Sequence, residues 1–194
     1  MSTPSPKSHW PKLIAVLVLV AITVTIFATG AYERIDPVAI QGTLQDAGLW
    51  GGLLFILAFA VLQPLHISAH VFIIAATLVW GPGEAILYAW TGSMAAAAVC
   101  YAFGNWVGED WMAERLPDRF ALRMNKIQAH SFKATLGVKL LFFTTPTLQM
   151  AFGAFKVDFR KCMAATAIAH AIYIIPEVLL GDQIAAWASS VWGG

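Results

Sequence analysis

Long apolar runs separated by short polar segments dominate the chain. The first run covers residues 13–31, and no formally charged residue occurs in 47–83 or in 85–108. Two more apolar runs follow at 134–155 and 162–181, with one charged residue each. Runs of about 20 apolar residues are long enough to cross the hydrocarbon core of a bilayer as helices. The pattern therefore predicts an all-α integral membrane protein.

The first run follows a polar tail at 1–12 that is rich in proline and serine. Ala28-Thr29-Gly30 vaguely resembles a signal-peptide cleavage site, but the run is longer than the apolar region of a typical signal peptide. A retained N-terminal transmembrane helix at 13–31 is the favoured interpretation.

The apolar stretch at 49–80 has a break in its middle. Its two arms are each too short to cross a bilayer comfortably, and they meet at Gln63-Pro64-Leu65. Pro64 lacks a backbone N–H and disfavours helix at the residue before it. Three full spans would need about 60 residues and would leave none for turns. We therefore expect a re-entrant hairpin at 49–80, followed by a full span at 85–108.

The run at 134–155 shows a similar break at Thr144-Thr145-Pro146. Both broken runs end in an aromatic residue and a glycine, Trp80-Gly81 and Phe152-Gly153, and a full span follows each, the second at 162–181. The spacing makes a weak internal repeat of 72 residues. Two hairpins that enter from opposite faces form the inverted-repeat layout of many transporters, whose broken helices meet near the bilayer midplane.

Charged residues gather in the segments between the apolar runs. Asp36 and Pro37 are typical of a helix N-cap and of the first helical residue, and they predict a short surface helix. In segment 109–133 apolar residues recur at helical spacing, which predicts an amphipathic helix on the membrane surface that Pro117 could break. The recurring apolar residues are Met112, Leu116, Phe120, Met124 and Ile127.

Lysine and arginine set the predicted orientation. The tail 1–12 has two of these residues, segment 32–48 has one, segment 109–133 has five, the corner 156–161 has three, and the tail 183–194 has none. Cytoplasmic segments carry the excess of lysine and arginine. We therefore expect a multi-pass protein of the cell (inner) membrane with a cytoplasmic N-terminus, and the side of the C-terminal tail stays open.

Composition agrees with a membrane protein and narrows its partners. Of 194 residues, 59% are hydrophobic and 12% charged, about half the charged fraction of a soluble domain. The net charge of +1 gives no basic surface for nucleic acid. Cys100 and Cys162 stand alone inside apolar runs, and we expect them to be buried and reduced. No cofactor and no metal site is predicted.

Three stretches carry a resemblance to a known family. They are LQDAGLWGGLLFILAFAVLQP (44–64), WGPGEAILYAWTGSMAAAAVCYAFGNWVGEDW (80–111) and PTLQMAFGAFKVDFRKCMAAT (146–166). In order and spacing they resemble the DedA family, which is also called the SNARE-associated Golgi protein or VTT-domain superfamily. The chain resembles a divergent, bacterial-type member of this family. The resemblance implies a membrane domain at 32–182 that moves phospholipid or polyprenyl phosphate between leaflets, in some members with coupling to the proton motive force.

The chain departs from the family pattern at both breaks. Family members usually carry Pro-Gly near the first tip, where this chain has Ser68-Ala69 and only the earlier Pro64. Near the second tip they carry an Arg followed by Pro-x-x-Pro, where this chain has Lys139 and only Pro146. A guanidinium grips a phosphate through paired hydrogen bonds and an ammonium does not. The headgroup chemistry implied by the family therefore does not transfer directly.

Polar residues at membrane depth form the candidate site. His66 and His70, spaced i, i+4 and expected on one helical face, could relay protons or contact a headgroup, or could satisfy broken backbone. Lys139 could attract a phosphate at the midplane or snorkel to the interface. For the polar residues of the second break, capping of free backbone groups is the favoured role.

The last span adds His170 and Glu177, which are spaced i, i+7 on one face. A structural role is favoured for Glu177, because Gly181-Asp182 is expected to end the span four residues later, although a buried carboxylate could carry protons. Glu84 is interpreted as a helix start. The predicted substrate or proton path comprises Pro64, His66, Ser68, His70, Lys139, Thr144, Thr145, Pro146, Gln149, His170 and Glu177.

Several glycines are expected to permit close helix packing around the broken runs. They are Gly81, Gly92, Gly104, Gly108 and Gly153.

Three functions fit these features. The first is a lipid transporter of scramblase or flippase type, with membrane lipids as partners and protons as a further partner. The second is a proton-coupled transporter of a small ion or solute. The third is a non-transporting membrane-integrity scaffold that binds a partner through 109–133, and self-association into a homo-oligomer stays open. An enzyme is not expected, because no nucleophile, base and orienting group stand at a recognisable spacing.

Overall fold

The structure is a computed structural model that describes residues 10–30, 37–115, 131–142 and 145–192. Contacts divide the chain into two compact units, Met1–Ile35 and Asp36–Gly194, which are treated separately. Every regular element in the described ranges is a helix. The all-α class predicted from the sequence is therefore confirmed for this part of the chain.

Helix α1 (Trp10–Ala28) belongs to the first unit and covers most of the span predicted at 13–31. The Thr25 and Thr29 hydroxyls each donate a hydrogen bond, 2.7 Å long, to the carbonyl four residues earlier. These bonds satisfy two polar side chains within an apolar helix. Insertion of α1 into a membrane stays a prediction.

The second unit begins with α2 (Pro37–Asp46), which starts at the predicted proline. Asp36, its predicted N-cap, lies outside the described residues. Helix α3 (Leu49–Leu62) then runs into the 3-10 turn η2 (Gln63–Leu65), and α4 (Ala69–Val79) follows. The helix therefore breaks at the predicted tip. We call α3, η2 and α4 the first broken pair.

Helix α5 (Pro82–Arg115) is longer than the span predicted at 85–108. It continues through residues that were expected to begin a separate surface helix, so there is no helix end at Gly108. The remainder of the predicted surface helix, with Pro117, lies largely outside the described residues, and the chain is described again from Ser131.

The last three helices are α7 (Ser131–Phe142), α8 (Pro146–Ala154) and α9 (Phe159–Trp192). We call α7 and α8 the second broken pair, because the predicted break at Pro146 separates them. Helix α9 does not end at Gly181, as the sequence predicted, but continues through Pro176 and Gly181 to Trp192. Gly181-Asp182, which was expected to end the span, therefore lies inside a helix.

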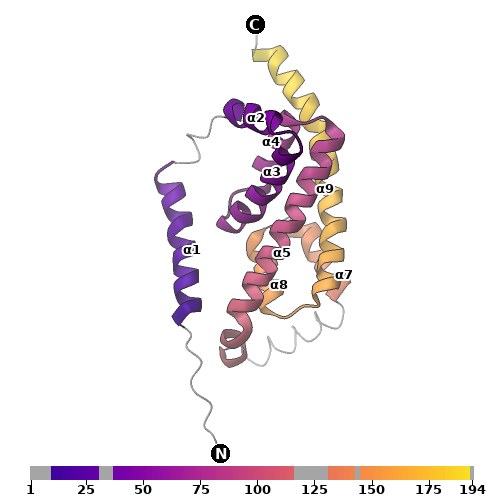
Figure 1. Cartoon of the computed structure of the whole chain (residues 1–194). Helices are drawn as coiled ribbons and strands as arrows, with labels where there is room; N and C mark the ends of the chain where they lie inside the picture. Colours follow the sequence, from indigo (N-terminus) through magenta and orange to yellow (C-terminus); the bar gives the residue numbers. More distant parts are fainter. Residues whose placement is uncertain (1–9, 31–36, 116–130, 143–144, 193–194) are drawn as a thin grey trace, which may run out of the picture. The chain divides into compact units, whose positions relative to one another are not determined.

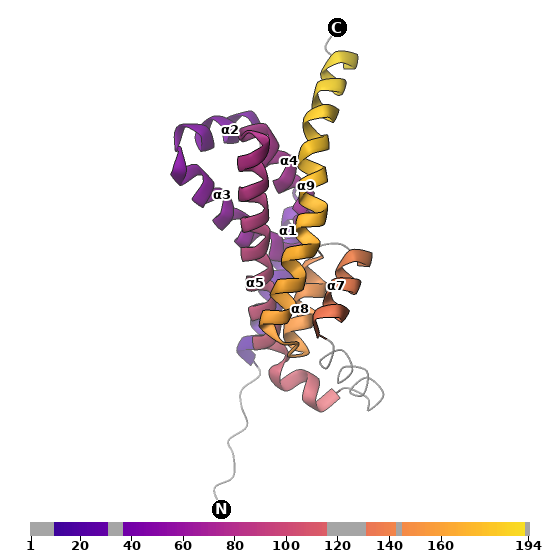
Figure 2. The same ribbon diagram turned by 90° about the vertical axis from the view of Figure 1, so that its right-hand side faces the viewer.

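Within the described ranges, two helices are long and apolar enough to cross a membrane, over Pro82–Gly108 in α5 and Phe159–Gly181 in α9. The helices of the first broken pair are apolar but shorter. In both views α5 and α9 run side by side, with α3 and α4 beside the first half of α5 and α8 beside its second half (Figures 1 and 2). The first broken pair and α8 therefore pack on opposite halves of α5, while α7 packs on α9.

The first broken pair is held by aromatic packing. Phe59 and Phe72 stack with ring centroids 4.3 Å apart, and Phe55 meets both of these rings and Trp80 edge-on. Phe59 thus meets the start of α4, and Phe55, one turn earlier on α3, also reaches Trp80 just after the end of α4, as expected for antiparallel arms. Phe59 also lies against Gly92 of α5, where an added Cβ would stand 2.8 Å from the ring.

The second broken pair approaches α5 through small residues. A Cβ on Gly153 of α8 would lie 2.0 Å from the Tyr101 carbonyl oxygen, and one on Gly104 would lie 1.9 Å from the Met150 carbonyl oxygen. Gly108 meets Ala154 in the same way. Close packing is thus confirmed for these glycines and for Gly92, but the prediction was wrong for Gly81, which has no atom within 4 Å of an added Cβ.

Candidate functional site

A small polar cavity lies where the two helix breaks approach each other. Its lining residues come from η2, α5, α7, α8 and α9, and they are Gln63, Ala97, Cys100, Lys139, Thr145, Pro146, Gln149 and His170. The space open to the centre of a water-sized sphere is about 10 Å³, about what one water molecule needs. We call this space the central cavity.

Lys139 is the charged residue of the central cavity. Its side chain is only 2% exposed, because α7 packs against α9 and the amino group faces the cavity. It therefore does not snorkel to an interface, which was one of its two predicted roles. Among the described residues no carboxylate lies within ion-pair distance of this amino group.

His170 enters the cavity from the middle of α9. Its Nδ1 lies 2.9 Å from the Ser93 hydroxyl oxygen, and that hydroxyl donates to the Trp90 carbonyl at 2.8 Å. Because the serine proton is already used, Nδ1–H of His170 must be the donor. Neutral His170 therefore keeps Nε2 as a bare acceptor, and this atom has no hydrogen-bond partner among the described residues.

The depth of this histidine follows from helix geometry. His170 lies about three turns after the start of α9, and Ser93 lies about three turns after the start of α5. Both positions are roughly 16 Å along helices that need about 30 Å to cross the hydrocarbon core. The central cavity therefore lies near the middle of the two membrane-length segments.

The second break supplies Thr145, Pro146 and Gln149. Gln149 is buried, with Nε2 3.7 Å from the Cys162 sulfur and Oε1 without a partner in the described part of the chain. Thr145 stands at the N-cap of α8, but its side chain makes no capping bond. The backbone carbonyl of Thr145 accepts from the N–H groups of Leu148 and Gln149 instead. The predicted capping role is therefore wrong for the Thr145 hydroxyl.

Thr144 lies outside the described residues. Pro64, predicted at the first tip, is buried within η2.

The two histidines of the first break do not share a helical face as predicted. His66 ends η2 with φ 62°, in the left-handed region, so it precedes α4 and does not belong to it. Its Nε2 hydrogen-bonds the Thr147 hydroxyl of α8 at 2.9 Å. Ser68 lies at the N-cap of α4, is exposed, and makes no side-chain capping bond.

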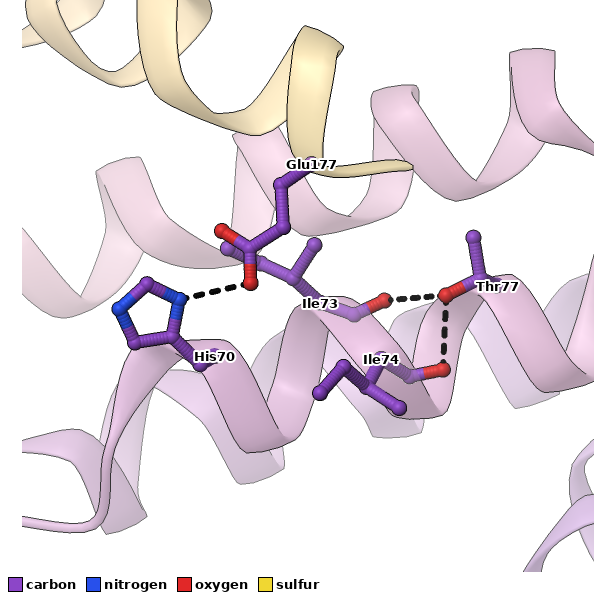
Figure 3. Close-up of polar contacts among 5 residues, drawn as sticks. All are labelled: His70, Ile73, Ile74, Thr77 and Glu177. Atoms are coloured by element: carbon purple, nitrogen blue, oxygen red, sulfur yellow. Dashed lines mark hydrogen bonds and ion pairs between the residues drawn. The ribbon is translucent and has the colours of Figure 1, made fainter. Parts of the chain in front are cut away.

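His70 binds a residue that is far away in the sequence. Its Nδ1 donates to Oε1 of Glu177 on α9 across 2.7 Å (Figure 3). Figure 3 also shows the next turns of α4, where the Thr77 hydroxyl bonds the Ile73 and Ile74 carbonyls and stays within its own helix. Glu177 therefore does not mark the end of a span, since it ties α9 to the first broken pair.

The remaining candidates have simpler positions. Glu84 is exposed in the first turn of α5, as predicted. Cys100 and Cys162 are buried and unpaired by disulfide, also as predicted. Among the residues that the structure describes, no three His, Cys, Asp or Glu side chains gather closely enough to hold a metal ion.

Sequence reasoning missed several residues of the site. Gln63 is buried at the first break and lines the central cavity, Ser93 holds His170, and Thr147 holds His66. Gln63 had a signal, because a glutamine beside Pro64 in an apolar run is costly unless it is bonded. Ser93 lies in a run of small residues and had no such signal.

Two long apolar helices, with two broken helical pairs whose breaks meet at a polar cavity, define the class of helical membrane proteins with interrupted helices. The sequence model of the VTT domain matches residues 67–183. The chain therefore belongs to the VTT-domain family, the DedA or SNARE-associated Golgi protein family, whose members are generally non-enzymatic membrane proteins. Neither a curated protein nor a solved structure gives a significant match to the chain.

Proposed function

We propose that this protein moves lipid, either phospholipid or polyprenyl phosphate, between the two leaflets of a cell membrane, as a scramblase or flippase does. The observation that carries the proposal is a line of exposed and half-exposed polar side chains that joins both helix breaks on an otherwise apolar surface. We call it the polar track. It consists of His66, Ser68, His70, Thr145, Thr147 and Glu177.

The polar track is continuous because two interhelical contacts connect its parts. One contact joins His66 to Thr147 of α8, and the other joins His70 to Glu177 of α9. Helices α4 and α9 also expose large apolar side chains, among them Val71, Ile74 and Leu179. A polar line with an apolar surround suits a lipid whose headgroup and tails need different environments.

The depth of the track follows from helix length. Helices α3 and α4 have 14 and 11 residues, about 21 and 16 Å at 1.5 Å per residue. Neither can cross a hydrocarbon core of about 30 Å. A pair that enters from one face therefore has its break, with His66 and Ser68, inside the membrane.

A headgroup crossing the membrane needs hydrogen-bond partners at this depth. Each unsatisfied polar group in hydrocarbon costs several kcal/mol. The imidazole, hydroxyl and carboxylate groups of the polar track offer the headgroup one hydrogen-bond partner after another. The acyl tails stay in the surrounding lipid. The central cavity is an unsuitable route, because a phosphate headgroup is larger than the single water that fits there.

Leaflet exchange in reconstituted vesicles tests the proposal. Fluorescent phospholipid is placed in both leaflets, and an impermeant reductant destroys the label that reaches the outer leaflet. We expect the wild-type protein to expose inner-leaflet label well above protein-free vesicles. Loss of label no faster than in protein-free vesicles, for both phospholipid and polyprenyl phosphate probes, would overturn the proposal.

A variant pair ties the activity to the polar track. His66→Ala combined with Thr147→Ala removes the contact between the two breaks, and we expect exchange to slow by roughly fivefold, since the lost hydrogen bond contributes about 1 kcal/mol. Thr91→Ala is the matched control, because the Thr91 hydroxyl on α5 bonds only its own helix, at the Leu87 carbonyl. Equal rates in both variants would remove the track from the mechanism.

The titratable residues favour a second candidate, a proton-coupled transporter of a small ion or solute. His70 and Glu177 form an ion pair within the polar track, and Lys139 and His170 face the central cavity. Such a transporter would respond to an imposed pH gradient. Solute uptake that ignores the gradient and is unchanged by His70→Ala and Glu177→Gln would exclude this candidate.

A further inference from the structure

The central cavity has an uneven set of hydrogen-bonding groups. Lys139 supplies N–H donors, while His170 Nε2 and Gln149 Oε1 are buried acceptors without partners among the described residues. The proton of Ser93 is committed to Trp90, which fixes Nδ1 as the protonated nitrogen of His170 and leaves Nε2 as a lone pair. Buried acceptors of this kind are normally satisfied, often by ordered water.

This arrangement does not suit an anion. Lone pairs on His170 Nε2 and Gln149 Oε1 would repel a negative charge, and the space is that of one water. A water molecule fits both the volume and the chemistry, because it can accept one hydrogen bond from Lys139 and donate two, to His170 and Gln149. The groups around it therefore match a neutral ligand with two donors and an acceptor.

The cavity also has a route to the surface. Thr145 lines the cavity and is exposed, and it belongs to the polar track. The titratable groups that face the cavity are Lys139 from α7, His170 from α9 and Cys100 from α5, with Cys162 of α9 next to Gln149. No aspartate or glutamate in the described part of the chain lines it.

We propose that the central cavity is a proton-binding site in which Lys139 takes up and releases one proton through a single water held between its amino group, His170 and Gln149. On release, one Nζ–H bond breaks and its electron pair stays on the nitrogen. The cavity water takes this proton, breaks its hydrogen bond to Gln149 and releases the freed proton to solvent at the surface beside Thr145. The site loses one positive charge, and uptake reverses each step.

The identity of residue 139 is what makes this chemistry available. Burial of an ammonium without a carboxylate partner is unfavourable, and this cost is removed when the group releases its proton. An arginine in the same place would stay charged throughout, since a guanidinium does not deprotonate in proteins. Lysine at this position therefore supplies a group that can bind and release a proton, which an arginine would not.

Nuclear magnetic resonance on the full chain in lipid nanodiscs tests the site without any transport assay. Histidine is labelled with ¹⁵N, lysine is labelled at Nζ, and the His170 and Lys139 signals are assigned by loss in His170→Gln and Lys139→Met. We expect the His170 Nε2 signal and the Lys139 signal to change at one shared pH midpoint. The His170 step should disappear in Lys139→Arg and in Lys139→Met.

These measurements test the proton-binding site independently of whether the protein moves lipid. A His170 step that persists in Lys139→Arg or Lys139→Met would show that His170 titrates alone, and it would overturn the proposal. A wild-type His170 signal without a shared step would show a fixed charge, with the same consequence. Lys139→Met keeps the test open if the arginine is too large for the cavity.

Discussion

The two broken pairs of this protein differ in where they keep their polar groups. In the first pair, α3 and α4 close on each other through stacked aromatic rings, and His66, Ser68 and His70 point outward. In the second pair, α7 packs mainly on α9 and α8 mainly on α5, and Lys139 and Gln149 point inward. Apart from Gln63 of η2, which lines the central cavity, the first pair has an aromatic interior and its polar groups at the surface, whereas the second pair keeps polar groups inside.

This difference separates two kinds of site in one membrane domain. The polar track is exposed and has apolar side chains around it, an arrangement that the proposed lipid substrate requires. The central cavity lies largely among buried side chains and has room for about one water molecule, which is too little for a lipid headgroup. Near-repeated sequences that break at similar places thus support different chemistry, according to which helix each arm packs against.

The strongest test of the aromatic interior of the first pair is Phe59→Ala. Phe59 is fully buried, stacks on Phe72 and fills the space over Gly92. We expect its removal to lower the free energy of unfolding by about 3–5 kcal/mol, measured by denaturant unfolding in detergent. Leu57→Ala is the control, because Leu57 is 53% exposed on the same helix. Similar losses in the two variants would refute the aromatic core as the basis of this pair.

The second pair depends on close backbone approach, and Gly153→Ala tests it. The new Cβ would lie 2.0 Å from the Tyr101 carbonyl oxygen on α5, so backbone must shift. We expect the free energy of unfolding to fall by about 2–3 kcal/mol, near the upper end of the range for overpacked cores. Gly137→Ala on α7 meets nothing within 4 Å and should stabilise by up to about 1 kcal/mol through helix propensity. If the midpoint temperature of thermal unfolding shifted in the same direction in both variants, this account would be contradicted.

The polar interior of the second pair is expected to contribute little to stability. Lys139→Met replaces a buried ammonium with an apolar chain of similar length, a change that is often neutral or stabilising by about 1 kcal/mol or more. The denaturation midpoint should therefore stay level or rise. A loss of about 2 kcal/mol would show instead that the ammonium holds the helices together. The functional interpretation of the cavity would then lose its main support.

The breaks could be predicted from the sequence because their causes are local. Pro64 and Pro146 each remove a backbone donor, and the helices end beside them in the structure. Helix ends further along were predicted wrongly at Gly108 and Gly181. Charge and glycine near those positions indicate where a membrane segment can end, but the backbone continues as helix to Arg115 and Trp192.

The partners of the site residues could not be predicted, because they depend on tertiary packing. His70 and Glu177 were each candidates, but their contact crosses more than half of the chain. The i, i+4 spacing of His66 and His70 suggested one helical face, and the left-handed backbone of His66 overrides that spacing. From the sequence, Lys139 could lie at the membrane midplane or reach the interface. Only the packing of α7 on α9 shows that it lines a cavity.

The smallest expected effect concerns the link between the first pair and α9. His70 and Glu177 form an ion pair whose side chains are 51% and 22% exposed, so screening limits its energy. A double-mutant cycle with His70→Ala and Glu177→Gln should give a coupling of about 0.5–1 kcal/mol in detergent unfolding. Both single variants should also lose less stability than Phe59→Ala, since aromatic packing holds the first pair. Strictly additive losses would mean that the contact carries no energy, and the polar track would then be two separate patches.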